Sequence, residues 1–166
     1  MRVGVLLTWR GPIAGVGLGV LIATASALES STSATYCADL KQLTQLAITA
    51  SQFTAIAGQP REGNFRDTSL PLTGWKDCAL YGTTTYTCDS RALRSSHEAE
   101  EALTKTTDEV LRCLAGSWVE IKDRSSASYV ALHPARGRAS MTLNLDEDDN
   151  KDYLVRLTLF LRRPGA

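Results

Sequence analysis

The sequence lacks the motifs that identify most hydrolases, redox enzymes and nucleotide-binding proteins. It has no Gly-x-Ser-x-Gly nucleophile elbow and no Cys-x-x-Cys pair. Its closely spaced glycines, Gly15, Gly17 and Gly19, lie in an N-terminal apolar segment, where no phosphate-binding loop is expected. His97 and His133 stand at no spacing typical of zinc ligands. No reaction, cofactor or metal is therefore predicted from a motif.

The sequence also lacks an excess of either charge and a long hydrophobic run. It contains 18 basic and 18 acidic residues, so nucleic acid is not expected as a partner. The longest apolar run, Ile13–Ile22, is ten residues long. A membrane-spanning helix needs roughly 20 such residues. We therefore expect the protein not to bind a membrane once its N-terminal segment is removed.

The N-terminus has the three parts of a secretory signal peptide. A positively charged start precedes the apolar run Ile13–Ile22, and small residues follow it. Ala25-Ser26-Ala27 predicts cleavage before Leu28, while Ala23-Thr24-Ala25 is a second option. A retained membrane anchor is the alternative interpretation. Cleavage before Leu28 would leave 16 basic and 18 acidic residues, a net charge of −2.

We therefore divide the chain into a signal peptide (1–27), a polar leader (28–35) and one small domain (36–163). The export signal predicts a periplasmic or secreted protein. The domain carries Cys37, Cys78, Cys88 and Cys113, and an even number of cysteines in an exported domain predicts disulfides.

Four cysteines allow three pairings. We favour Cys37–Cys78 with Cys88–Cys113, because each bond then ties a helix to a neighbouring strand. The alternative joins Cys78 to Cys88 across a hairpin and Cys37 to Cys113 between two helices. Either pairing predicts structural crosslinks.

Two segments show helical periodicity. Apolar residues recur at helical spacing over Tyr36–Ala57, and Gly58 predicts the end of that helix. A capping box, Ser95 with Glu98, opens a second helix that ends near Gly116. The segment between them, Gln59–Thr73, is polar and irregular and predicts a long loop.

The remaining apolar segments alternate as strands do. They predict an α+β fold, with two helices packed on an antiparallel sheet in the order α-β-β-α-β-β-β. The repeated order of helix and hairpin hints at a duplicated unit. The predicted strands are Trp75–Leu80, Thr84–Cys88, Ser128–His133, Arg138–Leu145 and Tyr153–Arg162, with a further short strand beginning at Trp118.

The first hypothesis for function is a binding or inhibitory module that acts on an envelope or secreted protein. A hairpin braced by disulfides presents its tip at a low entropic cost, which favours recognition. The candidate contact residues are Tyr81 and Thr83 at this tip and Arg136 and Arg138 in a basic turn. The long loop Gln59–Thr73 is a further candidate surface.

Two other hypotheses remain open. A small hydrolase would use dispersed carboxylates, of which Asp67, Asp77 and Asp89 lie near aromatic residues, or one histidine. A structural or accessory envelope protein would associate with itself through the edge of its C-terminal sheet. We favour the first hypothesis, because the sequence shows no catalytic constellation and predicts a small disulfide-bonded scaffold with one long loop and one hairpin tip.

The acidic segment Asp146–Asp152 places oxygen ligands on alternate residues, as a calcium loop does. The pattern then fails, since Lys151 stands where such a loop has glycine and Leu157 where it has glutamate. We interpret the segment as a charged hairpin turn that discourages edge-to-edge association.

Overall fold

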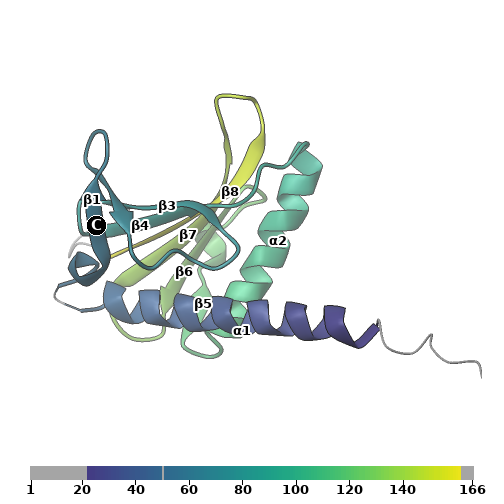
Figure 1. Cartoon of the computed structure of the whole chain (residues 1–166), viewed down its shortest axis with the longest axis horizontal. Coiled ribbons are helices and arrows are strands. Elements are labelled where there is room, and N and C mark those ends of the chain that lie inside the picture. The colour runs from purple at the N-terminus through teal and green to yellow at the C-terminus, as the bar shows by residue number, and fades with distance from the viewer. Residues whose placement is uncertain (1–21, 50, 162–166) are drawn as a thin grey trace, which may run out of the picture.

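The computed structural model describes residues 22–49 and 51–161 of the chain. Two helices, α1 (Ile22–Ala47) and α2 (Ser96–Cys113), pack on one antiparallel sheet of eight strands (Figure 1). The predicted fold class, two helices on an antiparallel sheet with two disulfides, is confirmed at this level. Residues 1–21 of the predicted signal peptide lie outside the described residues, and the cleavage site stays a prediction.

The strands form two meanders joined at the centre of the sheet. Their spatial order is β1-β2-β3-β4-β8-β7-β6-β5, and every neighbouring pair is antiparallel. Each helix precedes four consecutive strands, so the chain repeats a helix and a four-stranded meander. The strands are β1 (Ala57–Pro60), β2 (Phe65–Thr68), β3 (Lys76–Tyr81), β4 (Thr85–Asp89), β5 (Trp118–Glu120), β6 (Tyr129–Pro134), β7 (Ala139–Glu147) and β8 (Tyr153–Leu161).

The sheet buries one face beneath the helices. On β8, Val155, Leu157 and Leu159 are buried in the core, and Met141 and Leu143 of β7 lie beside them. Leu40 and Leu43 of α1 and Leu103 and Val110 of α2 belong to the same core cluster. The intervening residues of each strand face the other side. We call that side, which lies away from α1 and α2, the open face.

The first helix departs from its predicted bounds at both ends. It includes the predicted leader 28–35, because no glycine or proline interrupts residues 22–47. It ends at Ala47 rather than Ala57, where the hydroxyl of Thr49 donates to the carbonyl of Leu46 at 2.8 Å. Such side-chain bonds compete with the helix. Gln52 then adopts a φ of 47°, which takes the chain out of the helical path.

The predicted loop Gln59–Thr73 contains strand structure, so the strand order α-β-β-α-β-β-β was incomplete. The end of β1 and all of β2 lie within it. The strand β1 carries Gly58 and Pro60, residues that argue against a strand unless it lies at a sheet edge. It is an edge strand here and shows a register shift in its pairing with β2.

The second helix begins as predicted. The hydroxyl of Ser95 accepts a hydrogen bond from the backbone N–H of Glu98 at 3.2 Å. The carboxylate of Glu98 accepts from the N–H of Arg94, at 3.0 Å, rather than from that of Ser95. Gly116, just past the helix, has a φ of 73°, the left-handed conformation common at helix ends.

The favoured disulfide pairing is wrong, and the alternative is found. Cys78 and Cys88 bond across the β3–β4 hairpin with Cα atoms 4.1 Å apart. Cys37 of α1 bonds to Cys113, the last residue of α2, with Cα atoms 5.0 Å apart. The two helices meet directly, whereas the favoured pairing assumed that each cysteine of a helix faces a strand. Disulfides of small domains persist in oxidising compartments.

Within residues 22–49 and 51–161, no helix combines the length and apolar character needed to cross a membrane.

Candidate functional site

The open face carries four of the five large hydrophobic side chains that are exposed in the described residues. They are Phe65, Tyr81, Val119 and Tyr129, and the fifth, Ile48, follows α1. A contiguous patch of exposed hydrophobic side chains typically marks a site of interaction, whereas single exposed side chains are ordinary.

An aromatic pair stands at one end of this face. Phe65 of β2 lies directly opposite Tyr81 of β3, and their side chains are 41% and 50% exposed. The ring centroids lie 5.3 Å apart with the planes at 67°, an edge-to-face contact. Each ring therefore limits the conformational freedom of the other side chain before any partner binds.

The turn beside this pair is fastened to the rest of the fold. The carbonyl of Thr83 accepts from the N–H of Phe53 at 3.2 Å. The N–H of Gly82 donates to the carbonyl of Asn64 at 2.8 Å. The predicted contact residues Tyr81 and Thr83 thus lie on a braced hairpin tip.

The basic turn lies at the same end of the sheet. Thr85 pairs with Phe160 of β8, which pairs with Ser140 of β7, so the β3–β4 and β6–β7 turns share one sheet end. Three strand spacings, about 14 Å, separate β3 from β7. Arg136 and Arg138 of the second turn are both exposed.

The two arginines have no carboxylate within ion-pair distance in the part of the chain that the structure describes. Arg136 also lines a hollow of about 510 Å³ with Lys41 and Ile48, and so lies on the helix side of its turn. The structure thus brings all four predicted contact residues to one end of the molecule.

The three carboxylates considered for hydrolysis do not converge. Asp67 pairs with Arg61. Asp89 accepts two hydrogen bonds from Arg156, at 2.7 and 2.9 Å. Asp77 lies at the exposed start of β3.

The two histidines also lie apart from each other. His97 is exposed on α2, 3.4 Å from the carboxylate of Glu101. His133 lies on β6 with its Nδ1 atom 3.0 Å from the carbonyl of Pro134.

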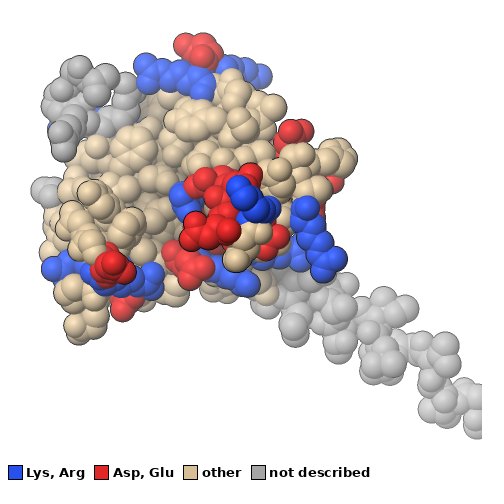
Figure 2. Space-filling model, turned by 90° about the horizontal axis from the view of Figure 1, so that it is seen from above, with Lys and Arg blue, Asp and Glu red and all other residues tan. Residues whose placement is uncertain are grey.

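The acidic segment forms the β7–β8 hairpin turn. The carboxylate of Asp148 accepts from the N–H groups of Asn150, at 2.8 Å, and Asp152, at 3.0 Å. Lys151 pairs with Glu147 at 3.1 Å. Figure 2 looks down on this turn, where acidic and basic side chains gather above a largely uncharged surface. The carboxylate of Asp148 therefore stabilises the turn through hydrogen bonds within it.

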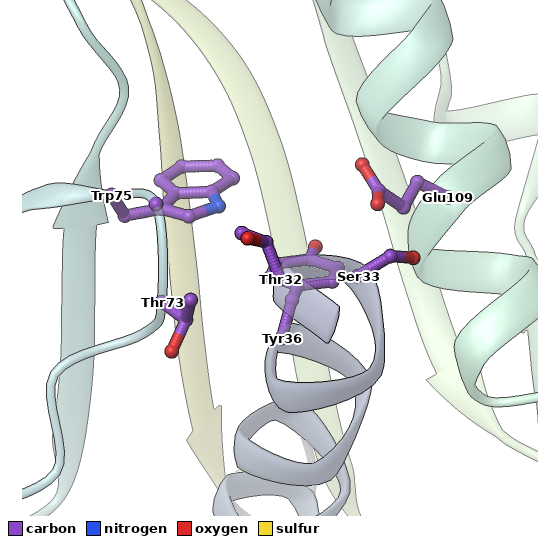
Figure 3. Close-up of a pocket in the computed structure, with 7 residues that line it drawn as sticks. Thr32, Ser33, Tyr36, Thr73, Trp75 and Glu109 are labelled. Atoms are coloured by element: carbon purple, nitrogen blue, oxygen red, sulfur yellow. The ribbon is translucent and has the colours of Figure 1, made fainter. Parts of the chain in front are cut away.

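A groove on the helix side of the sheet was missed by sequence reasoning. It encloses about 420 Å³ between α1, the loop before β3 and α2. Figure 3 shows Tyr36 between Trp75 on one side and Glu109 on the other. The sequence predicts Tyr36 and Trp75 only as the first residues of a helix and a strand, and their positions do not show that Glu109 stands opposite. The lining residues are Thr32, Ser33, Tyr36, Thr73, Gly74, Trp75 and Glu109.

Tyr36 lies at the floor of this groove. Its side chain is 5% exposed, and its hydroxyl has no hydrogen-bond partner among the described residues. Burial, and then the charge of Glu109, raise the pKa of this hydroxyl well above its ordinary value. The hydroxyl is therefore protonated at physiological pH and is able to donate and accept.

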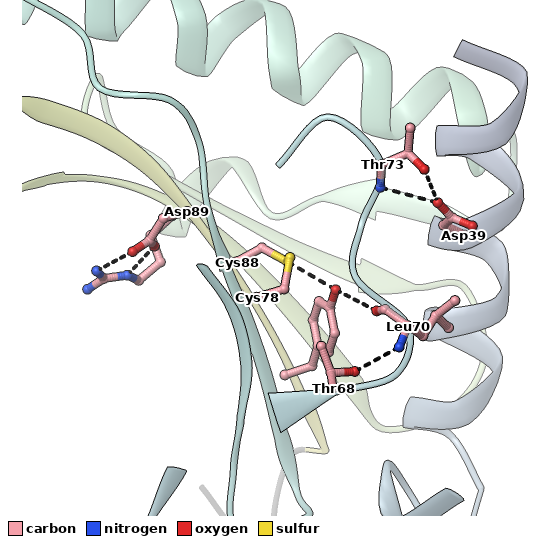
Figure 4. The surroundings of a disulfide bond; sticks show 9 residues. Asp39, Thr68, Leu70, Thr73, Cys78, Cys88 and Asp89 are labelled. Carbon is pink, nitrogen blue, oxygen red and sulfur yellow. Dashed lines mark hydrogen bonds and ion pairs between the residues drawn. A yellow bond between two sulfur atoms is a disulfide. The ribbon is translucent and has the colours of Figure 1, made fainter. Parts of the chain in front are cut away.

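The loop that carries Trp75 is held against α1 (Figure 4). The carboxylate of Asp39 accepts from the N–H and the hydroxyl of Thr73, at 3.2 and 2.5 Å. Gly74 follows with a φ of 84°, a conformation that favours glycine. These features fix the wall of the groove relative to Tyr36.

No protein-family model, curated protein or solved structure matches the chain.

Proposed function

We propose that the chain is an exported binding or inhibitory module that takes a protein partner at the aromatic end of its open face. In this proposal it acts in the periplasm or outside the cell. The observation that carries the proposal is the edge-to-face pair of Phe65 and Tyr81, which is exposed beside the braced tip of the β3–β4 hairpin.

The composition of this end is typical of protein-binding sites and supports the proposal. Aromatic residues and arginine are enriched among the residues that dominate interface energies. Tyr81 and Phe65 supply aromatic rings, and Arg138 supplies a guanidinium, at the same end of the sheet. The unpaired arginines favour a partner that presents carboxylates beside an apolar patch.

The rigidity of the β3–β4 hairpin tip favours binding with little loss of conformational entropy. The β3–β4 hairpin carries the Cys78–Cys88 bond, and its turn is hydrogen-bonded on both sides. Side chains that are already ordered lose less freedom when a partner binds. Affinity then depends chiefly on the contacts themselves.

The test compares variants in capture of a partner from envelope extract by the oxidised chain. The double variant Phe65→Ala/Tyr81→Ala should lower the affinity for the captured partner at least tenfold, since such anchors each contribute about 1–2 kcal/mol or more. Binding is measured by titration of the purified partner.

Tyr129→Ala is the matched control. Tyr129 is also on the open face and 38% exposed, but it pairs with Asn144 toward the opposite end of the sheet. Its loss should leave the affinity unchanged. Equal affinities for the double variant and the wild type, with both folded, would exclude this surface.

A further inference from the structure

We infer that the Tyr36 groove is a binding site for a neutral, hydroxyl-rich ligand, a sugar ring. The site lies on the helix side of the sheet, away from the open face, and does not depend on the proposed protein partner. In the residues that the structure describes, the buried hydroxyl of Tyr36 has no hydrogen-bond partner, and such groups are rare in folded proteins.

The groove presents both hydrogen-bond donors and acceptors. The hydroxyl of Tyr36 donates or accepts, the indole N–H of Trp75 donates, and the carboxylate of Glu109 accepts. Figure 3 shows Trp75 and Glu109 facing the space above Tyr36 from opposite sides. Sugar hydroxyls donate and accept at once, so they match groups of both kinds.

The aromatic wall of the groove suits the apolar C–H face of a sugar ring. Trp75 is partly buried, and packs against the core while it lines the groove. The indole is a large, flat apolar surface. The C–H face of a sugar ring packs on such a surface through dispersion and the removal of water.

The charges around the groove argue against a charged ligand. Glu109 lies 3.7 Å from Arg112, which offsets part of its charge. An adjoining lobe of about 350 Å³ shares Tyr36, Trp75 and Glu109 and adds the cations Arg91 and Lys105. A cation would meet Arg91 and Lys105, and an anion would meet Glu109. The two lobes together fall within the usual size of small-molecule sites.

The experiment follows the indole N–H resonances of the oxidised full chain by NMR during titration with the methyl glycosides of glucose, galactose and N-acetylglucosamine. The chain has three tryptophans, Trp9, Trp75 and Trp118, and Trp75→Phe assigns the signal of the groove. We expect at least one glycoside to shift the Trp75 signal with saturation, and the signal of buried Trp118 to stay in place.

Tyr36→Phe should weaken this binding about fivefold, the effect of losing one hydrogen bond. Tyr86→Phe is the matched control, because Tyr86 is also buried but its hydroxyl donates to the carbonyl of Leu70 outside the groove. Its affinity should equal that of the wild type.

Three outcomes would overturn the inference: no glycoside shifts the Trp75 signal, Tyr36→Phe binds as well as the wild type, or methylammonium or acetate saturates the site where the glycosides do not. None of these outcomes bears on the proposed partner surface, because that surface is tested through Phe65 and Tyr81.

Discussion

At the scale of single residues, two buried tyrosines differ in the use of their hydroxyls. Tyr86 donates to the carbonyl of Leu70 at 3.0 Å, whereas Tyr36 has no partner among the described residues. Removing a bonded hydroxyl costs its hydrogen bond, while removing an unpartnered one relieves a buried polar group.

The first prediction follows from this difference. Tyr86→Phe should lower the free energy of unfolding by about 1 kcal/mol, and Tyr36→Phe should leave it unchanged or raise it. Urea unfolding of the oxidised chain without added sugar measures both. A loss of stability in Tyr36→Phe as large as that in Tyr86→Phe would show that its hydroxyl is bonded in the free protein.

The second prediction concerns alkaline pH. Burial raises the pKa of both tyrosines, from an ordinary value of 10.0, with Glu109 adding to the effect for Tyr36 and Asp39 for Tyr86. Their contribution to stability is complete below pH 10.0 and falls above it, because the unfolded chain loses these protons first.

The expected fall is up to about 1.4 kcal/mol per pH unit for each tyrosine. Urea unfolding at a series of alkaline pH values measures it. The variant Tyr36→Phe/Tyr86→Phe should show a shallower decline, and an identical decline would contradict the prediction.

The sequence predicted the roles of single residues correctly where those roles depend only on neighbouring residues in the chain. Ser95 caps its helix as its motif predicts. The exposed position of Tyr81 agrees with its place at a hairpin tip, but its partner Phe65 comes from a segment predicted as loop. The Tyr36 groove depends on contacts between segments far apart in the sequence, and no local pattern reveals them.

At the scale of elements, the join between the two meanders carries an ionic cluster. Arg156 of β8 binds Asp89 of β4 through two hydrogen bonds and also bonds to Asp146 of β7. The hydrogen bonds that Arg156 donates to Asp89 raise its pKa most. The charges of Asp89 and Asp146 add to this effect, and together they outweigh burial, which lowers the pKa. One guanidinium therefore links three strands at the centre of the sheet.

The third prediction is that Arg156→Ala lowers the free energy of unfolding by roughly 1–2 kcal/mol, because it leaves two neighbouring carboxylates without a cation. Arg112→Ala is the control, since Arg112 is 71% exposed and its pair with Glu109 should contribute little. Urea unfolding compares them. Equal effects from the two variants would mean that Arg156 acts as an ordinary surface charge.

Element prediction from the sequence was best for long, regular patterns. The alternating residues of β7 and β8 and the stripe of α2 identify those elements closely. The strands β1 and β2 were missed because they are short, and β1 contains Gly58 and Pro60. The disulfide pairing depends on how the helices pack, which the periodicity of each helix does not give.

At the scale of the whole molecule, the two disulfides constrain very different lengths of chain. Cys37–Cys113 closes a separation of 76 residues and Cys78–Cys88 one of 10. The entropy of loop closure grows with this separation.

The fourth prediction is that Cys37→Ser/Cys113→Ser destabilises the fold more than Cys78→Ser/Cys88→Ser does. Loop-closure entropy gives upper values of about 4.5 and about 2.7 kcal/mol. Thermal and urea unfolding of the two double variants measure the difference. A larger loss from the hairpin bond would mean that chain entropy does not govern its contribution.

In the proposed function a protein partner binds the aromatic end of the open face, and crosslinking from single positions on that face locates the partner. A photoreactive phenylalanine analogue replaces Tyr81 in one chain and Tyr129 in another, and each is irradiated with the captured partner. We expect a covalent adduct from position 81 and little from position 129. Adducts from position 129 alone, or equal adducts from both, would contradict it.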